Sequence, residues 1–258
     1  MEIIKCPPSE LRAERMLTYD ASHYSFLEAV LAVLGEDIDT DLSKLHETDL
    51  GRQVSSSNAQ ALPRFNPWFN RFNRCESEHP EIFEKFEQVY HNFLRSVVLP
   101  HLGTDTLAFE KRPLLRTHLP GEATHGSAHR DSDSGHAACE INFWIPLTAA
   151  HGSNSLFTES QRGIEDFHPL VAKGPGECVR FYGSQVLHYT IPNTTDATRV
   201  SFDFRVIRYE EWTSDAFNNF PLGDHFLVVN ALYGVLAPDS VEMRRLLYDL
   251  DQKRSDTK

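Results

Sequence analysis

The chain has 258 residues, of which 37 are acidic and 25 are basic, so its formal net charge at pH 7 is −12. This balance argues against a nucleic-acid or anionic-lipid surface, which needs clustered lysine and arginine, but it permits a cationic substrate. No apolar run approaches the roughly 20 residues that span a bilayer, and the four scattered cysteines are typical of reduced thiols, so we predict a cytoplasmic protein with no membrane or nucleic-acid partner.

The first 103 residues are predicted to be mostly helical. Residues 22–36, SHYSFLEAVLAVLGE, place apolar side chains at helical spacing, with Ser22 as a candidate N-cap and Gly35 near the end. Residues 79–102, HPEIFEKFEQVYHNFLRSVVLPHL, carry a stripe of aromatic and aliphatic residues, and Pro100 is expected to end this helix. Such a stripe is typical of core packing rather than of a cofactor site, so both helices need an apolar surface to cover.

Between residues 104 and 208 the pattern changes to short segments rich in β-branched and aromatic residues, separated by glycine and proline. The segments are TLAFEKRPLLRTHLP, CEINFWIPL, ECVRFY, VLHYTI and TRVSFDFRVI. No helix of convincing length lies between them, which disfavours a parallel βαβ sheet. An antiparallel core of this kind closes best as a jelly roll, a double-stranded β-helix of cupin type that protects its edge strands.

Residues 209–258 are predicted to return to helix, with SVEMRRLLYDLDQ as the clearest segment. At this length a single domain with a β core is ordinary. We therefore predict a mainly β fold with flanking α in one domain over residues 1–258, in which the helical N-terminal and C-terminal parts enclose the jelly-roll core.

Two of the predicted strands alternate between polar and apolar residues. In TRVSFDFRV one face carries Arg199, Ser201, Asp203 and Arg205, and in CEINFWI one face carries Glu140, Asn142 and Trp144. These faces either meet water, as in a one-sided antiparallel sheet, or line the mouth of a barrel whose apolar faces pack under helices. The two N-terminal amphipathic helices favour the second interpretation.

The segment HRD places His129 and Asp131 on one side of an extended chain. With thirteen histidines, a His-x-Asp pair is expected by chance roughly once. A kinase catalytic loop also contains HRD, but here no asparagine stands five residues after Asp131 and no glycine-rich loop precedes it. A stronger signal lies downstream, where His188 is followed by Arg199 and Ser201 in an H-x10-R-x-S pattern.

Two histidines and one carboxylate, with open positions opposite, form the facial triad of non-haem Fe(II) oxygenases. His129, Asp131 and His188 are the candidate ligands and would leave sites for a bidentate co-substrate and O₂. The forked guanidinium of Arg199 can hold a distal carboxylate by two parallel hydrogen bonds, and Ser201 on the same face can add one more.

These motifs resemble the Fe(II)/2-oxoglutarate-dependent dioxygenases of the phytanoyl-CoA-hydroxylase-like superfamily. The resemblance is carried by HRDSDSGHAACEINFWIPLT, SNSLFTE and HYTIPNTTDATRVSFDFR, covers roughly residues 104–208, and is greatest to the bacterial branch of streptomycin-type aminoglycoside biosynthesis. It implies that His129, Asp131 and His188 hold iron, and that Arg199 and Ser201 hold the C5 carboxylate of 2-oxoglutarate. Asn142 matches a position that touches the co-substrate. The branch often has an aromatic residue where this chain has Ser134.

Three further residues are candidates for substrate contact. Arg116 and His118 share a face of LLRTHLP, although a salt bridge within the sheet would explain them equally, and His136 follows the HRD motif closely. Glu140 is a candidate to steady a ligand histidine from behind. Four carboxylates near the motif, or in the long loop after it, are candidates to attract a cation; they are Asp133, Glu159, Glu165 and Asp166.

The sequence therefore predicts an oxygenase that uses Fe(II), 2-oxoglutarate and O₂. It would oxidise a C–H bond of a small polar, amino-bearing metabolite in a biosynthetic pathway, with release of succinate and CO₂. Two alternatives stay open. One is a cupin-type metal enzyme that does not use 2-oxoglutarate, and the other is a non-catalytic regulator that binds 2-oxoglutarate or metal.

Overall fold

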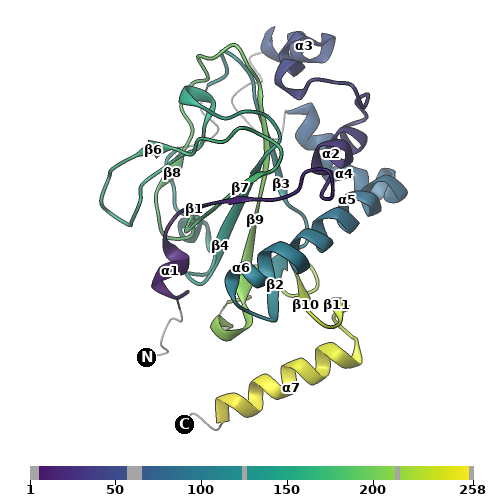
Figure 1. Ribbon diagram of the computed structural model, residues 1–258, viewed down its shortest axis with the longest axis vertical. Coiled ribbons are helices and arrows are strands. Elements are labelled where there is room, and N and C mark those ends of the chain that lie inside the picture. The colour runs from purple at the N-terminus through teal and green to yellow at the C-terminus, as the bar shows by residue number, and fades with distance from the viewer. Residues whose placement is uncertain (1–5, 57–65, 124–126, 213–215, 256–258) are drawn as a thin grey trace.

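The computed structural model describes residues 6–56, 66–123, 127–212 and 216–255 (Figure 1). Its helices are α1 (Ser9–Arg12), α2 (Phe26–Leu34), α3 (Asp49–Ser56), α4 (Pro67–Glu78), α5 (Pro80–Phe93), α6 (Leu99–Leu102) and α7 (Val241–Ser255). Its longer strands are β1 (Arg15–Thr18), β2 (Thr106–Glu110), β3 (Leu114–His118), β4 (Ile141–Pro146), β7 (Glu177–Phe181), β9 (Arg199–Arg208), β10 (Phe226–Asn230) and β11 (Gly234–Leu236). The short strands are β5 (Phe157–Thr158), β6 (His168–Pro169) and β8 (His188–Tyr189).

The strands form two antiparallel sheets. The larger has the order β1-β7-β4-β9-β2-β10-β11, with β3 also paired to β9, and the smaller has the order β6-β5-β8. In Figure 1, helices α2, α4 and α5 lie on one side of the larger sheet, and β6 and β8 lie on the other. This is the predicted jelly roll with flanking helices. Among the described residues, no helix combines the length and the apolar character that crossing a bilayer requires.

The aromatic stripe of α5 packs on the apolar face of β9, as the sequence predicts. Phe86 lies 5.8 Å from Phe202 between ring centroids, and Tyr90 lies 5.0 Å from Phe204. Phe26 of α2 reaches the same strand, 5.1 Å from Phe202. The helices therefore cover one face of the sheet, which leaves the opposite, polar face of β9 for the interior of the jelly roll.

Replacing Phe86 with alanine is expected to lower the free energy of unfolding by about 3–5 kcal/mol, because the ring is fully buried among other aromatic rings and leaves a cavity. For a chain of this size the thermal midpoint should fall by roughly 10 °C. Differential scanning calorimetry measures the change. Lys85→Ala on the exposed face of the same helix is the control and should shift the midpoint by less than about 2 °C; equal shifts would contradict the assignment of the stripe to the core.

Two helix boundaries differ from the prediction. Ser22 does not cap α2, because its hydroxyl and backbone N–H both bond to Asp20 Oδ1 and the helix begins at Phe26. The helix after α5 also does not end at Pro100. A π-helical turn (Leu94–Val98) leads into α6. Pro100 lies in the first turn of α6, a position at which proline is tolerated although it has no backbone N–H. Gly103 ends the helix with φ +63°.

Strands also lie in the two parts that were predicted as helical. β1 pairs with β7 along the sheet edge, and β10 and β11 extend the sheet beyond β2. The N-terminal part is mostly helical, as predicted, with β1 as its one described strand. The prediction for residues 209–258 was only partly right, because β10 and β11 come before the helix α7. A short continuous apolar run such as FLVVN in β10 cannot be told from helix by periodicity alone, and β1 is largely exposed and is defined by its pairing rather than by its own sequence.

Candidate metal centre

His129 and His188 are brought together by the backbone. They form an antiparallel bridge in which each N–H donates to the other residue's carbonyl, at 3.2 and 3.0 Å, and their ring centroids lie 4.4 Å apart. The Nδ1 atom of each ring lies near a carbonyl oxygen, Ser127 at 3.0 Å and Val186 at 3.2 Å. A carbonyl only accepts, so Nδ1 carries the proton in both rings and Nε2 is free to bind a metal.

Asp131 completes the cluster at the start of a 3₁₀ turn (Asp131–Ser134) that ends at Gly135, φ +91°. Its Oδ1 atom lies 3.8 Å from His129 Nε2 and 3.6 Å from His188 Nε2. The ligand atoms of the three residues all lie within 4.8 Å of one another, a spacing that one metal ion can bridge. Within the described ranges, no other group of three such side chains meets this condition.

The protonation states of the cluster suit a metal. Burial alone would raise the pKa of Asp131, but the Arg205 guanidinium and its hydrogen bonds hold this pKa well below its usual range. Burial lowers the pKa of His188 to about 4. At neutral pH the cluster therefore offers one carboxylate and a neutral His188 imidazole, which are the forms that bind divalent cations.

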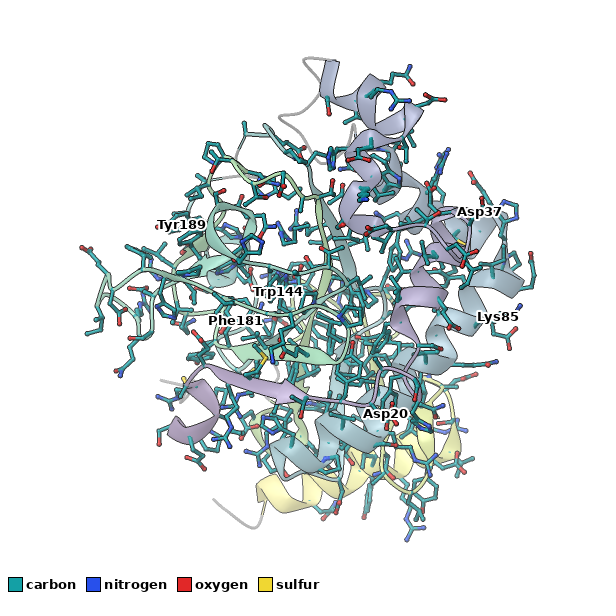
Figure 2. All side chains as sticks on the ribbon, turned by 45° about the horizontal axis from the view of Figure 1, so that its top comes forward. Asp20, Asp37, Lys85, Trp144, Phe181 and Tyr189 are labelled. Atoms are coloured by element: carbon teal, nitrogen blue, oxygen red, sulfur yellow. The ribbon has the colours of Figure 1, made fainter. Side chains whose placement is uncertain are left out.

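The cluster opens into a narrow cavity of about 60 Å³ inside the jelly roll. Its lining is Arg116, His129, Trp144, Leu156, Phe181, His188, Tyr189, Thr190, Arg199, Asp203 and Arg205. Figure 2 shows Trp144, Phe181 and Tyr189 together in the half of the molecule away from Asp37 and Lys85, which belong to the helical layer. A larger cavity of about 770 Å³ lies between α1 and residues 160–168, but no member of the cluster lines it.

Arg199 is almost fully buried in the wall of the narrow cavity. Its Nη1 donates to Ser201 Oγ at 2.6 Å, whereas its Nε, also buried, has no hydrogen-bond partner. Burial and the neighbouring Arg116 lower the pKa of Arg199 to about 10, so the side chain stays cationic at neutral pH. A buried cation with an unused donor is costly unless an anionic group completes it, which makes Arg199 suited to bind a carboxylate.

Of the three candidate substrate residues, one lines the narrow cavity and two lie outside its lining. Arg116 lines the cavity, with its Nε 3.9 Å from Asp203 Oδ1, so it fits both interpretations offered by the sequence. His118 is fully buried and is not among the residues that line the cavity. His136 stacks on Phe220, with ring centroids 4.0 Å apart, and also lies outside the cavity lining.

Asn142 lies in β4 and Glu140 comes just before this strand, and the partners that the structure shows for them are not the ones that the sequence predicted. Asn142 donates from Nδ2 to Asp131 Oδ2 at 2.7 Å, so it contacts a candidate ligand directly; a contact with the co-substrate stays a prediction. Glu140 bonds to His136 Nδ1 at 2.7 Å and to the Ala137 N–H. The expectation that Glu140 steadies a ligand histidine is wrong, because both ligand Nδ1 atoms face backbone carbonyls.

The acidic residues near the motif hold loops in place. Glu159 is buried and accepts from the N–H groups of Leu187 at 2.8 Å and Gly163 at 2.7 Å. Asp166 accepts from Ser160, and Asp133 accepts from Arg130. Because these carboxylates and Glu165 lie outside the cavity lining, they give little local support to the attraction of a cation.

The sequence did not predict that Arg205 bonds to Asp131, and it did not mark Glu110 as part of the site. Arg205 donates two hydrogen bonds to Asp131, at 2.8 and 3.0 Å, and Glu110 accepts from Arg205 Nη1 at 2.9 Å. The alternation in β9 places Arg205 on the same face as Arg199, which was a usable signal. No sequence signal connects Glu110 to the site.

No family model matches the chain. The streptomycin biosynthesis protein StrG of Streptomyces griseus is 29% identical over 191 residues, which cover 74% of this chain and 83% of StrG. The solved structure of EctD from S. alaskensis with 2-oxoglutarate and 5-hydroxyectoine aligns with a TM-score of 0.50 and 13% identity over 81% of this chain and 78% of that chain. The nickel complex of the non-heme monooxygenase ThoJ aligns with a TM-score of 0.45 and 14% identity over 95% and 96%. The EctD alignment supports the jelly-roll fold.

Proposed function

We propose that the protein is an Fe(II)- and 2-oxoglutarate-dependent oxygenase that oxidises a C–H bond of a small polar metabolite. The observation that carries this proposal is a single cavity lined both by two of the three candidate metal ligands and by the buried Arg199 with its unused donor. A metal site alone would fit many enzymes. A metal site beside a buried, incompletely bonded guanidinium fits a co-substrate that binds metal at one end and carries a carboxylate at the other.

The donor set fits Fe(II). Two neutral imidazoles and one carboxylate suit a divalent iron and leave coordination positions for other ligands. His129, Asp131 and His188 would hold the ion, and Arg199 with Ser201 would hold the C5 carboxylate of 2-oxoglutarate. When bound, iron, 2-oxoglutarate and O₂ together supply the oxidising chemistry, with succinate and CO₂ as co-products.

The remaining lining residues keep this chemistry confined. Trp144 and Phe181 are almost fully buried and form apolar walls, which would limit the access of water to the position that the metal would occupy. Asp203 lies between Arg116 and Arg205, at 3.9 and 3.8 Å, and balances part of their charge. Tyr189, which is half-buried, and Arg116 belong to the less buried part of the lining, where a substrate would enter.

The substrate belongs to the polar metabolites of a biosynthetic pathway. The 29% identity to StrG supports placement in the aminoglycoside-related branch of the phytanoyl-CoA-hydroxylase-like superfamily, and an amino-bearing substrate agrees with the net charge of −12. The alternative of a cupin-type enzyme without 2-oxoglutarate leaves the buried Arg199 unexplained. A non-catalytic regulator is disfavoured because all three candidate ligands are present and assembled.

Purified protein loaded with Fe(II) is expected to convert 2-oxoglutarate to succinate only in the presence of O₂, and an accepted substrate should raise the rate several-fold. Chromatographic quantification of succinate over a panel of amino sugars, basic amino acids, neutral sugars and an acyl-CoA measures this. Metal-free protein and Fe(II) under argon are the controls. Absence of succinate formation from protein shown to contain Fe(II), over the whole panel, would contradict the proposal; efficient turnover of the acyl-CoA alone would contradict the substrate class.

A further inference from the structure

The carboxylate of Asp131 is held by three donors that leave its two oxygens unequal. Oδ2 accepts from Arg205 Nε at 2.8 Å and from Asn142 Nδ2 at 2.7 Å. Among the described residues, Oδ1 accepts from Arg205 Nη2 alone, at 3.0 Å, and it is the oxygen that faces both imidazoles. The hydrogen bonds thus commit one oxygen to the protein and present the other to the metal position.

Arg205 is itself fixed from behind by Glu110 at the end of β2. Nη1 donates to both carboxylate oxygens of Glu110, at 2.9 and 3.2 Å, and the backbone N–H of Arg205 donates to Oε2 at 3.0 Å. His225 Nε2 lies 3.1 Å from the same carboxylate. Arg205, Glu110 and Asp131 are all less than 8% exposed, so these contacts are shielded from solvent.

The position of Asn142 is fixed by the pairing of β4 with β9 and by the close approach of Gly183. In the β4–β9 pairing it lies directly opposite Arg205, so both donors approach Asp131 from neighbouring strands. Gly183, whose carbonyl accepts the Asp131 N–H at 3.0 Å, has no side chain to interfere; a Cβ there would lie 2.8 Å from the Asn142 amide atoms. The backbone and the side chain of Asp131 are therefore both restrained.

From these contacts we propose that Arg205, anchored by Glu110, is a positioning residue that holds Asp131 so that only Oδ1 is available to the metal. The inference rests on the metal site of the proposed function. Only an arginine can do this, because its planar fork spans Asp131 with one edge and reaches Glu110 with another, whereas lysine is a compact point charge. Partners that orient metal ligands in this way commonly change metal affinity by about 10- to 100-fold.

Arg205→Lys tests the proposal, because it keeps the charge and removes the fork. Co(II) alone is the probe, and its dissociation constant and visible absorption spectrum are measured by anaerobic titration at a temperature where every variant is folded by circular dichroism. We expect the dissociation constant to rise by about 10- to 100-fold and the spectrum to change. Arg208→Lys, the same substitution in the same strand at a residue paired with Glu210 and Glu211, should match wild type.

A second variant covers the case in which Arg205→Lys does not fold. Asn142→Ala removes one donor to Oδ2 and should raise the Co(II) dissociation constant by roughly tenfold. If the folded variants bind Co(II) within twofold of wild type with an unchanged spectrum, Arg205 and Asn142 are purely structural and the proposal is overturned. Wild type that binds Co(II) but forms no succinate would overturn the proposed function alone, and wild type that does not bind Co(II) would overturn both.

Discussion

Replacing His188 with alanine is expected to abolish Fe(II)-dependent succinate formation. The substitution removes one of only two candidate imidazole ligands, and His129 with Asp131 would hold a divalent ion far more weakly. The loss should exceed the roughly 100-fold that removal of an outer partner of a ligand can cost. Metal content by mass spectrometry and succinate by chromatography should fall together, while circular dichroism of the metal-free protein stays close to that of wild type.

His168→Ala is the matched control for this substitution. His168 lies in the same small sheet as His188, but it is partly exposed and pairs with Glu14 at 2.7 Å, outside the narrow cavity. This variant should retain its metal and its turnover. Wild-type turnover in His188→Ala would show that iron binds elsewhere and would remove the basis of the proposed function.

Replacing Arg199 with alanine is expected to raise the KM for 2-oxoglutarate by about 100-fold. A hydrogen bond to a charged group contributes about 1.5–3 kcal/mol, and Arg199 offers its unused Nε and its charge to the carboxylate. Arg199→Lys should give an intermediate increase because it keeps the charge without the fork. Steady-state succinate formation at varied 2-oxoglutarate measures both constants.

The affinity for the metal separates this role from damage to the site. Co(II) binding to Arg199→Ala should stay within a few-fold of wild type, because in the described part of the chain Arg199 bonds to Ser201 and forms no hydrogen bond or ion pair with the three candidate ligands. Arg112→Ala, at a surface arginine paired with Glu76, is the control and should leave the KM unchanged. An unchanged KM in Arg199→Ala would assign the co-substrate carboxylate to another cation, and Arg116 in the cavity lining would be the candidate.

Strand periodicity predicted the orientation of β9 correctly. Arg199, Asp203 and Arg205 line the cavity, and Phe202 and Phe204 pack beneath α2 and α5. Alternation succeeds here because the strand is long and has unlike environments on its two sides. Alternation does not show which residues of one face reach the cavity. Arg116 and His118 were therefore both predicted to contact substrate, although of the two only Arg116 lines the cavity.

The partners of the buried polar side chains could not be predicted from the sequence. Glu110 stands 95 positions before Arg205, and the two meet because β2 and β3 both pair with β9 and bring the end of β2 to the middle of β9. His136 and Glu140 lie four residues apart in sequence and bond to each other instead of to the metal cluster. Whether a buried carboxylate serves a ligand or a neighbouring side chain depends on tertiary packing, which composition and spacing do not encode.

The reciprocal backbone bond between His129 and His188 has a consequence for how such a protein can diversify. Main-chain geometry joins the two histidines, so their separation does not depend on the length of the intervening chain. That chain includes the loop of residues 160–168, most of which is exposed. Phe167 of this loop lies 5.3 Å from Tyr189 of the cavity lining between ring centroids, so insertions or deletions there would change the surroundings of Tyr189 and leave the histidine pair in register. If the protein has the proposed function, related proteins could therefore acquire new substrates through changes in this loop, while the pairing of the two histidines is kept.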